Sequence, residues 1–182
     1  MRHISRGLAL ATVLLLLGTT ALSAQKPQTR KGFWIGFGFG YGSYGISCNG
    51  CPSDNESSYT GYLKLGGTLN PHLLLGAETV GWSKSEGGAT ITAGNVSFNA
   101  YYYPTPAGGF FLNGGLGFSR VDASGGGSSS GDTGPGFSLG AGYDIRVGTN
   151  LSVVPNAQWV YGHPTDGLSQ SFLHFALGVT FH

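Results

Sequence analysis

Two cysteines, Cys48 and Cys51, carry the only thiols of the chain, and two residues separate them. A catalytic pair with this spacing needs a helix N-terminus or a nearby cation to lower a thiol pKa. Here the pair stands in a Gly- and Ser-rich stretch, and two thiols alone do not complete a structural zinc site. The pattern predicts a disulfide between Cys48 and Cys51 in an exported chain, with a metal site or free thiols as the alternatives.

Histidine is the next candidate for chemistry, and the five histidines are scattered along the chain. An enzyme of the lipid A deacylase type would need a His and a Ser on the lipid-facing side near the outer rim, with a carboxylate to orient the His. His163 is followed by Pro164, Thr165 and Asp166, which supply no Ser, and His174 falls on the opposite face of its segment. The sequence therefore predicts no catalytic residue, no metal, no cofactor and no enzyme.

Two carboxylates, Glu78 and Asp144, could in principle act as a general acid and a general base. Asp144 shares the small, polar face of its segment with Arg146. Glu78 lies on the same kind of face as Lys64, which belongs to the preceding segment. A tight turn at 70–72 places Lys64 directly across from Glu78, and opposite charges facing each other across strands are favourable. We therefore expect Lys64, Glu78, Asp144 and Arg146 to form a charge network inside a narrow lumen, where each charge needs a partner.

The segments that hold these residues alternate with period two, as β-strands do. From Gly32 to Tyr41, large apolar residues alternate with residues that are mostly Gly. A face almost without side chains suits a narrow lumen, whereas the apolar face suits lipid. The same pattern predicts eight strands, at about 32–41, 58–69, 73–84, 90–103, 110–121, 136–147 and 151–161, and in a last segment that ends at Phe181.

Composition restricts the class of protein further. The 182 residues include 34 Gly and only 9% charged residues, which excludes a disordered chain, and the net charge of +1 gives no basis for nucleic-acid binding. Arg2 and Arg6 precede a short apolar run and small residues near Ala24, which predicts a cleaved signal peptide at 1–24. We expect a short extension at 25–31 and a barrel at 32–182, exported to the outer membrane of a bacterium.

Connections and aromatic residues agree with a barrel that spans a membrane. Short turns are expected at 70–72, 104–109 and 148–150, and longer polar loops at 43–57, 85–89, 122–135 and 162–170. Aromatic side chains on the outward face should mark the two membrane interfaces. One ring is predicted from Phe33, Tyr102, Phe110 and Phe181, and the other from Tyr41, Tyr59, Phe118, Phe137 and Trp159.

The closing segment from Phe172 to Phe181 alternates apolar residues with small or polar ones, and His182 follows it. On this segment and the strand pattern, the chain resembles the small outer-membrane β-barrel proteins of the OmpA/OmpX type over about 31–182. The resemblance implies an all-β, eight-stranded antiparallel up-and-down transmembrane barrel. It also implies contact with outer-membrane lipid and lipopolysaccharide, and recognition of the C-terminal strand by the barrel assembly machinery.

Three functions fit this architecture. An eight-stranded barrel is filled by its own side chains, which favours a structural or surface-interaction role with ligand binding at loops 43–57 and 122–135. A small pore for ions or small solutes is the second, because a Gly-rich lumen could leave water-filled gaps. The third is a secreted lipocalin-like ligand binder, which would require the apolar face to point inward.

Overall fold

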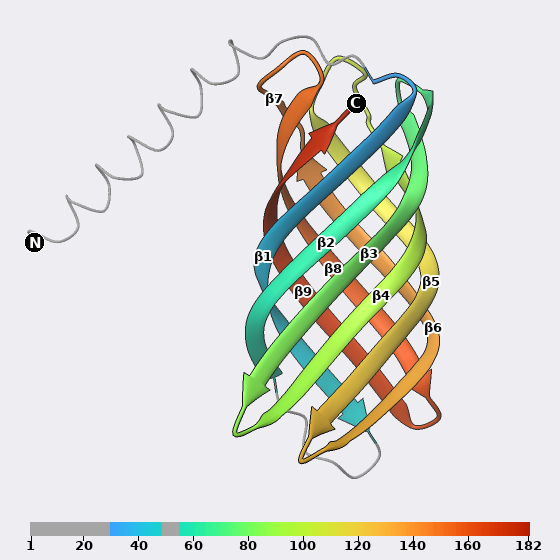
Figure 1. Cartoon of the computed structure of the whole chain (residues 1–182). Helices are drawn as coiled ribbons and strands as arrows, with labels where there is room; N and C mark the ends of the chain where they lie inside the picture. Colours follow the sequence, from blue (N-terminus) through green and yellow to red (C-terminus); the bar gives the residue numbers. More distant parts are fainter. Residues whose placement is uncertain (1–29, 49–54) are drawn as a thin grey trace, which may run out of the picture.

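The computed structural model describes residues 30–48 and 55–182, and these form one closed antiparallel barrel (Figure 1). The strands are β1 (Phe33–Cys48), β2 (Asn55–Asn70), β3 (Leu73–Glu86), β4 (Ala89–Tyr102), β5 (Phe110–Gly125), β6 (Ser128–Tyr143), β7 (Ile145–Arg146), β8 (Leu151–Thr165) and β9 (Leu168–Phe181). Strands β1 to β6 pair in chain order, β8 pairs with β6, β7 and β9, and β1 also pairs with β9, which closes the barrel. The predicted signal peptide lies outside the described residues.

The short strand β7 continues the line of β6, so the barrel wall has eight members, as predicted. The break falls at Asp144, whose backbone N–H donates to the Gly109 carbonyl at 2.8 Å. The register with β8 stops at Gly142 opposite Asn156 and resumes at Ile145 opposite Val153. The end of the barrel that holds both described chain termini is called the terminal end below, and the opposite end the hairpin end.

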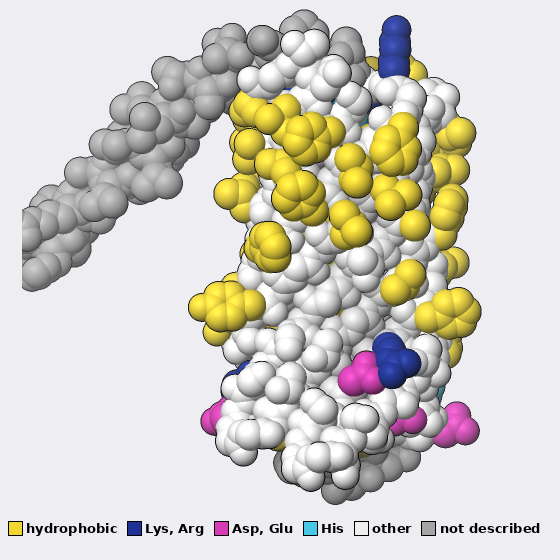
Figure 2. Space-filling model, viewed as in Figure 1, with side chains coloured by type: hydrophobic (Ala, Val, Ile, Leu, Met, Phe, Trp, Pro, Cys, Tyr) yellow, Lys and Arg dark blue, Asp and Glu magenta, His cyan; other side chains and the backbone are white. Residues whose placement is uncertain are grey.

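The apolar face of the strands points outward. Phe39 and Leu116 are each 76% exposed, and other Leu, Phe and Val side chains share their orientation. On the face shown in Figure 2, hydrophobic side chains gather toward the terminal end, whereas acidic side chains appear only toward the hairpin end. A lipocalin-like binder needs this face inward, so that alternative is wrong. No helix within the described ranges is long and apolar enough to cross a membrane.

The connections at the hairpin end differ from the expectation of long polar loops. Strands continue through most of 85–89, 122–135 and 162–170, and through the described parts of 43–57. Two-residue turns join them at 87–88 and 126–127, where all four residues are Gly with φ between 59° and 84°. Only Gly adopts this conformation without strain. The Ser- and Gly-rich composition that suggested loops therefore belongs to strands that pair outside the apolar band.

The lumen is packed rather than hollow. One buried cluster, toward the hairpin end, includes Trp82, Tyr44 and Phe172. A second, toward the terminal end, includes Trp34 and Phe111. Inward-facing glycines make room for these rings.

The glycine positions show how close this packing is. A Cβ at Gly76 would lie 2.8 Å from the Trp34 ring, and one at Gly142 would lie 2.5 Å from the Phe111 ring. The Gly-rich face is thus occupied by aromatic side chains from other strands, and the expectation of water-filled gaps is not met at these positions.

Candidate functional site

A polar layer separates the two aromatic clusters of the lumen. Lys64 stands directly opposite Glu78 in the β2–β3 register, and both side chains are buried. Glu78 accepts hydrogen bonds from the Tyr101 hydroxyl and, at 2.6 Å, from the Gln158 amide. The Lys64 ammonium lies 5.0 Å from the centre of the Tyr101 ring and 5.1 Å from that of Phe111. The layer therefore contains two opposite charges that face each other in register, and these charges make contacts with neutral donors and aromatic rings.

His174 belongs to the same layer, on the inward face where the sequence placed it. Its side chain is fully buried, and its two ring nitrogens lie 3.1 Å from Gln158 Oε1 and 3.3 Å from Thr60 Oγ1. A buried imidazole with both nitrogens in polar contact is satisfied by its surroundings. Its contacts are those of a structural side chain.

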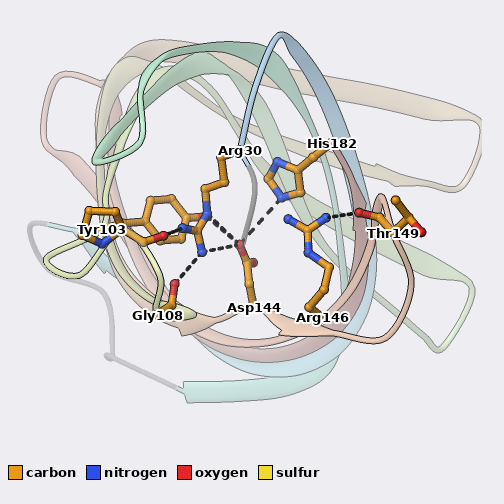
Figure 3. Close-up of polar contacts among 8 residues, drawn as sticks. Arg30, Tyr103, Gly108, Asp144, Arg146, Thr149 and His182 are labelled. Atoms are coloured by element: carbon orange, nitrogen blue, oxygen red, sulfur yellow. Dashed lines mark hydrogen bonds and ion pairs between the residues drawn. The ribbon is translucent and has the colours of Figure 1, made fainter. Parts of the chain in front are cut away.

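Asp144 is the centre of a second polar cluster, which closes the terminal end (Figure 3). Its Oδ2 accepts from the Tyr103 hydroxyl at 2.9 Å and lies 3.4 Å from the Arg30 guanidinium. Arg30 also donates to the carbonyls of Pro106 at 3.0 Å and Gly108 at 2.7 Å. Its guanidinium carbon lies 3.5 Å from the centre of the Tyr103 ring. One carboxylate thus holds the chain that precedes β1 against the β4–β5 connection.

The C-terminal residue joins this cluster as well. His182 Nε2 lies 3.7 Å from Asp144 Oδ2, and both side chains are almost fully buried. Arg146 points into the same end of the barrel and donates to the Thr149 carbonyl at 3.1 Å (Figure 3). The structure therefore gathers Asp144 and Arg146 in one cluster, with Lys64 and Glu78 in the layer beyond it.

Sequence reasoning missed Arg30 and His182, which it assigned to an extension and to the chain end. The signal available in the sequence was charge balance: a buried Asp144 needs a cation nearby, and Arg30 is one of only nine Lys and Arg residues in the chain.

The cavity left within the polar layer is small. It measures about 10 Å³ and is lined by Tyr62, Lys64, Glu78 and Gln158 among others. That is close to the volume needed by one water molecule. Among the described residues, aromatic clusters fill the lumen on both sides of this cavity, which argues against a continuous aqueous path for ions.

We expect the purified barrel to produce no conductance steps in a planar lipid bilayer, because the two aromatic clusters and the Asp144 cluster fill the lumen. The measurement should include a wide porin as a positive control in the same bilayer. Reproducible steps that scale with the amount of protein inserted would restore the pore hypothesis.

A histidine and a serine do meet on the outward face near the hairpin end, which the sequence did not reveal. His163 Nδ1 lies 3.0 Å from Ser169 Oγ, and the Tyr161 hydroxyl lies 3.1 Å from the same oxygen. The β8–β9 register shifts between Gly162 and Thr165, and this bulge brings the two together. Among the described residues no carboxylate is hydrogen-bonded to His163, and no three His, Cys, Asp or Glu side chains converge on a metal site.

The aromatic residues expected at the interfaces lie on the outward face. Phe33, Tyr102, Phe110 and Phe181 stand at strand ends on the terminal end, and each is at least 45% exposed. Phe137 is half-buried and packs against Trp159, with ring centres 5.4 Å apart. Of the predicted disulfide, Cys48 ends β1, whereas Cys51 lies outside the described residues, so the bond stays a prediction.

Charged side chains gather at the hairpin end, with Arg120 and Asp122 on the outward face and Lys84 on the inward face at the barrel rim. Arg120 donates to Asp122 at 2.6 and 2.7 Å, and these hydrogen bonds lower the pKa of Asp122. Lys84 bridges Glu56 and Glu86, whose carboxylates raise its pKa. With Asp132 and Asp166, acidic side chains outnumber basic ones here.

The β6 strand has one unpaired edge at this end. Its register with β5 runs from Ser128 to Tyr143, whereas its register with β8 begins only at Gly136. Within the described part of the chain, no strand pairs with the second edge of β6 from Ser128 to Thr133, whereas the His163 carbonyl of β8 lies close to Gly134.

Comparisons with known proteins agree with this architecture. A family model described as an outer membrane protein β-barrel domain matches residues 12–181. Ail, the attachment invasion locus protein of Yersinia pestis, superposes with a TM-score of 0.60 at 18% identity, over 83% of this chain and 99% of its own. Neisserial surface protein A gives 0.59 at 16% identity, over 85% and 99%. The N-terminal barrel domain of Pseudomonas aeruginosa OprF gives 0.52 at 15%, over 84% and 100%. No curated protein gives a significant sequence match.

Proposed function

We propose a surface-interaction role for this chain, which belongs to the outer membrane protein β-barrel family and lies in the outer membrane. The proposed activity is binding without catalysis: an extended polypeptide adds as a further strand to the free edge of β6. The observation that supports it is the unpaired edge from Ser128 to Thr133, in a part of the barrel wall that reaches beyond the apolar band.

The strands are longer than a membrane crossing requires. The full-length strands have 14 to 16 residues, whereas about 9–11 tilted residues cross a bilayer. The apolar side chains lie toward the terminal end, so the surplus length stands at the hairpin end (Figure 2). In barrels of this kind the chain termini face the periplasm, and we accordingly assign the hairpin end to the cell exterior. The extension is a rigid platform of paired strands.

Backbone geometry determines which groups the free edge offers. Residues that adjoin a two-residue turn form a hydrogen-bonded pair, and the pairing then alternates along the hairpin. Ser128 adjoins the turn and bonds to β5, so the N–H groups of Ser129, Gly131 and Thr133 point to the other edge. Pro135 is the next residue whose backbone nitrogen points away from β5. No hydrogen bond to β5 is lost there, and edge strands tolerate Pro at such positions. Small side chains leave the edge accessible to an added strand.

Charge argues against a polyanionic ligand. Ail, one of the structural neighbours, is known in complex with the heparin analogue sucrose octasulfate. The hairpin end of this chain carries Glu56, Glu86, Asp132 and Asp166 together with Lys84 and the Asp122–Arg120 pair, so acidic side chains are in excess and repel sulfate groups. A neutral or basic peptide strand is the better match.

Other contacts proposed for the chain follow from its location. Outward aromatic rings and aliphatic side chains suit the lipid tails of the outer membrane, and lipopolysaccharide surrounds the outer half of such a barrel. The barrel assembly machinery is the proposed partner of β9, which ends in the exposed Phe181. The loop between β1 and β2, at 49–54, is a further proposed contact, and it lies outside the described residues.

The test removes backbone N–H donors from the free edge of β6 while the barrel stays folded. A phage-displayed library of random dodecapeptides is panned on the protein in lipid nanodiscs, and the selected peptides are measured against the variant S129P/T133P. Loss of two edge N–H groups should weaken their binding at least tenfold, because strand addition depends on main-chain hydrogen bonds.

The matched control is S129A/T133A, which keeps both N–H groups and removes the side-chain hydroxyls. It should bind the selected peptides as the wild type does. Equal binding to the proline variant, or a loss already present in the alanine variant, would show that peptides dock elsewhere and would contradict the proposal. Heat-modifiable gel mobility verifies that all three barrels are folded.

A further inference from the structure

A groove of about 840 Å³ crosses the outward faces of β1, β9, β8 and β6. Its floor is formed where Gly40, Ala176, Asn156 and Gly142 succeed one another as direct register partners. These residues face the lumen, so the outer surface between the flanking side chains is bare backbone. The groove is therefore a gap between two rows of outward side chains.

The two rows differ in size along their length. Tyr41 and Phe175 form one wall over β1 and β9, and Phe39 and Leu177 face them from the other row. Farther along the first row the outward residues are Ala157 and Ala141, also direct partners. Two adjacent alanines among aromatic neighbours lower this wall, so the groove is open over β8 and β6.

The direction of the groove follows from the strand tilt. Register partners succeed one another along the hydrogen-bonding direction, and strands in such barrels are tilted by about 40° from the axis. The groove therefore runs obliquely across the apolar band. It ends beside Phe110 and Tyr143, which are the first residue of β5 and the last of β6 at the terminal end.

We propose that this groove holds an acyl chain of a phospholipid from the inner leaflet of the outer membrane. The groove is continuous with the lipid-facing surface, and a concave apolar wall left without contacts forfeits dispersion energy. It reaches the terminal end beside Phe110 and Tyr143, on the side assigned above to the periplasm, where the inner leaflet supplies phospholipids. The proposal depends on the membrane location and is separate from binding at the free edge of β6.

The test places a large side chain in the groove at Ala157 or Ala141, the two small residues of its wall. Native mass spectrometry of protein extracted in a mild detergent counts the phospholipids that remain bound. Wild type should retain one phospholipid, and A157F should retain it with at least tenfold lower occupancy because the phenyl ring takes the place of the chain. A141F fills the same groove from β6, so a folding defect in one variant leaves the other as a test.

The control variant is A77F, which adds the same ring to an exposed outward Ala on β3, outside the groove. It should retain the lipid as wild type does. Equal retention in A157F and wild type would overturn the proposal. A retained mass that corresponds to lipopolysaccharide, or a wild-type dimer that A157F separates into monomers, would also overturn it, by assigning the groove to another occupant.

Discussion

Replacing Asp144 by Ala is expected to lower the free energy of unfolding by about 3–5 kcal/mol, the usual cost of removing one partner of a buried charge pair. The carboxylate accepts from Tyr103 and faces Arg30 and His182, all of them buried. Without it, the guanidinium of Arg30 remains in the closed terminal end with two carbonyl acceptors and no counter-charge. Urea unfolding in lipid vesicles, followed by Trp fluorescence, measures the change.

A double-mutant cycle separates the contact from general damage. R30A alone and D144A alone should each destabilise the barrel, and R30A/D144A should cost clearly less than the sum, because residues in one network are not additive. Asp122→Ala is the control: this carboxylate is exposed, pairs with Arg120 at the hairpin end, and should leave the unfolding transition unchanged. Strict additivity of the first pair would contradict the role assigned to Asp144.

The face of each strand was predictable from the sequence, because a period of two leaves little freedom once one face meets lipid. Lys64 opposite Glu78 is an example, and its register is as expected. The turn itself is at 71–72, with Asn70 paired to Leu73, and a register shift between Thr68 and Asn70 compensates for the shorter turn. The outward position of Phe39 and Leu116 and the inward position of His174 follow from the same rule.

The ends of the strands were not predictable in the same way. Outside the hydrocarbon the alternation of apolar and polar residues ceases, so Ser128 to Thr133 have the composition of a loop. What makes them a strand is pairing with β5 across the Gly126–Gly127 turn. The turn residues can be recognised from the local sequence, but the number of residue pairs that β5 and β6 form next to the turn cannot.

Contacts between distant strands were also beyond the sequence. The aromatic ring that covers each inward glycine depends on barrel curvature, as when Trp34 of β1 lies over Gly76 of β3. Likewise, His163 and Ser169 meet because of a bulge in β8. Composition predicted a narrow lumen, whereas the pairing of rings with glycines required the closed structure.

Trp82→Ala should destabilise the barrel by about 3–5 kcal/mol, which is typical of removing a large aromatic side chain from a core. Trp82 is 2% exposed, stacks on Tyr44 with ring centres 4.7 Å apart, and donates to the Gly42 carbonyl at 3.2 Å. Phe39→Ala removes an aromatic ring from the lipid-facing surface and should cost less, about 1.5–3 kcal/mol, because it loses the transfer of the ring from water into lipid but leaves no cavity in a packed core. The same urea titration in lipid vesicles compares the two.

The two lumen clusters provide a sharper form of this prediction. Trp34 lies in the cluster at the terminal end, and the polar layer of Lys64 and Glu78 separates it from Trp82. Costs of distant, independent sites add within about 0.5 kcal/mol. W34A/W82A should therefore cost the sum of the two single variants. A double variant that costs much less than this sum would mean that the lumen collapses as one unit, and the description of two separately packed clusters would be wrong.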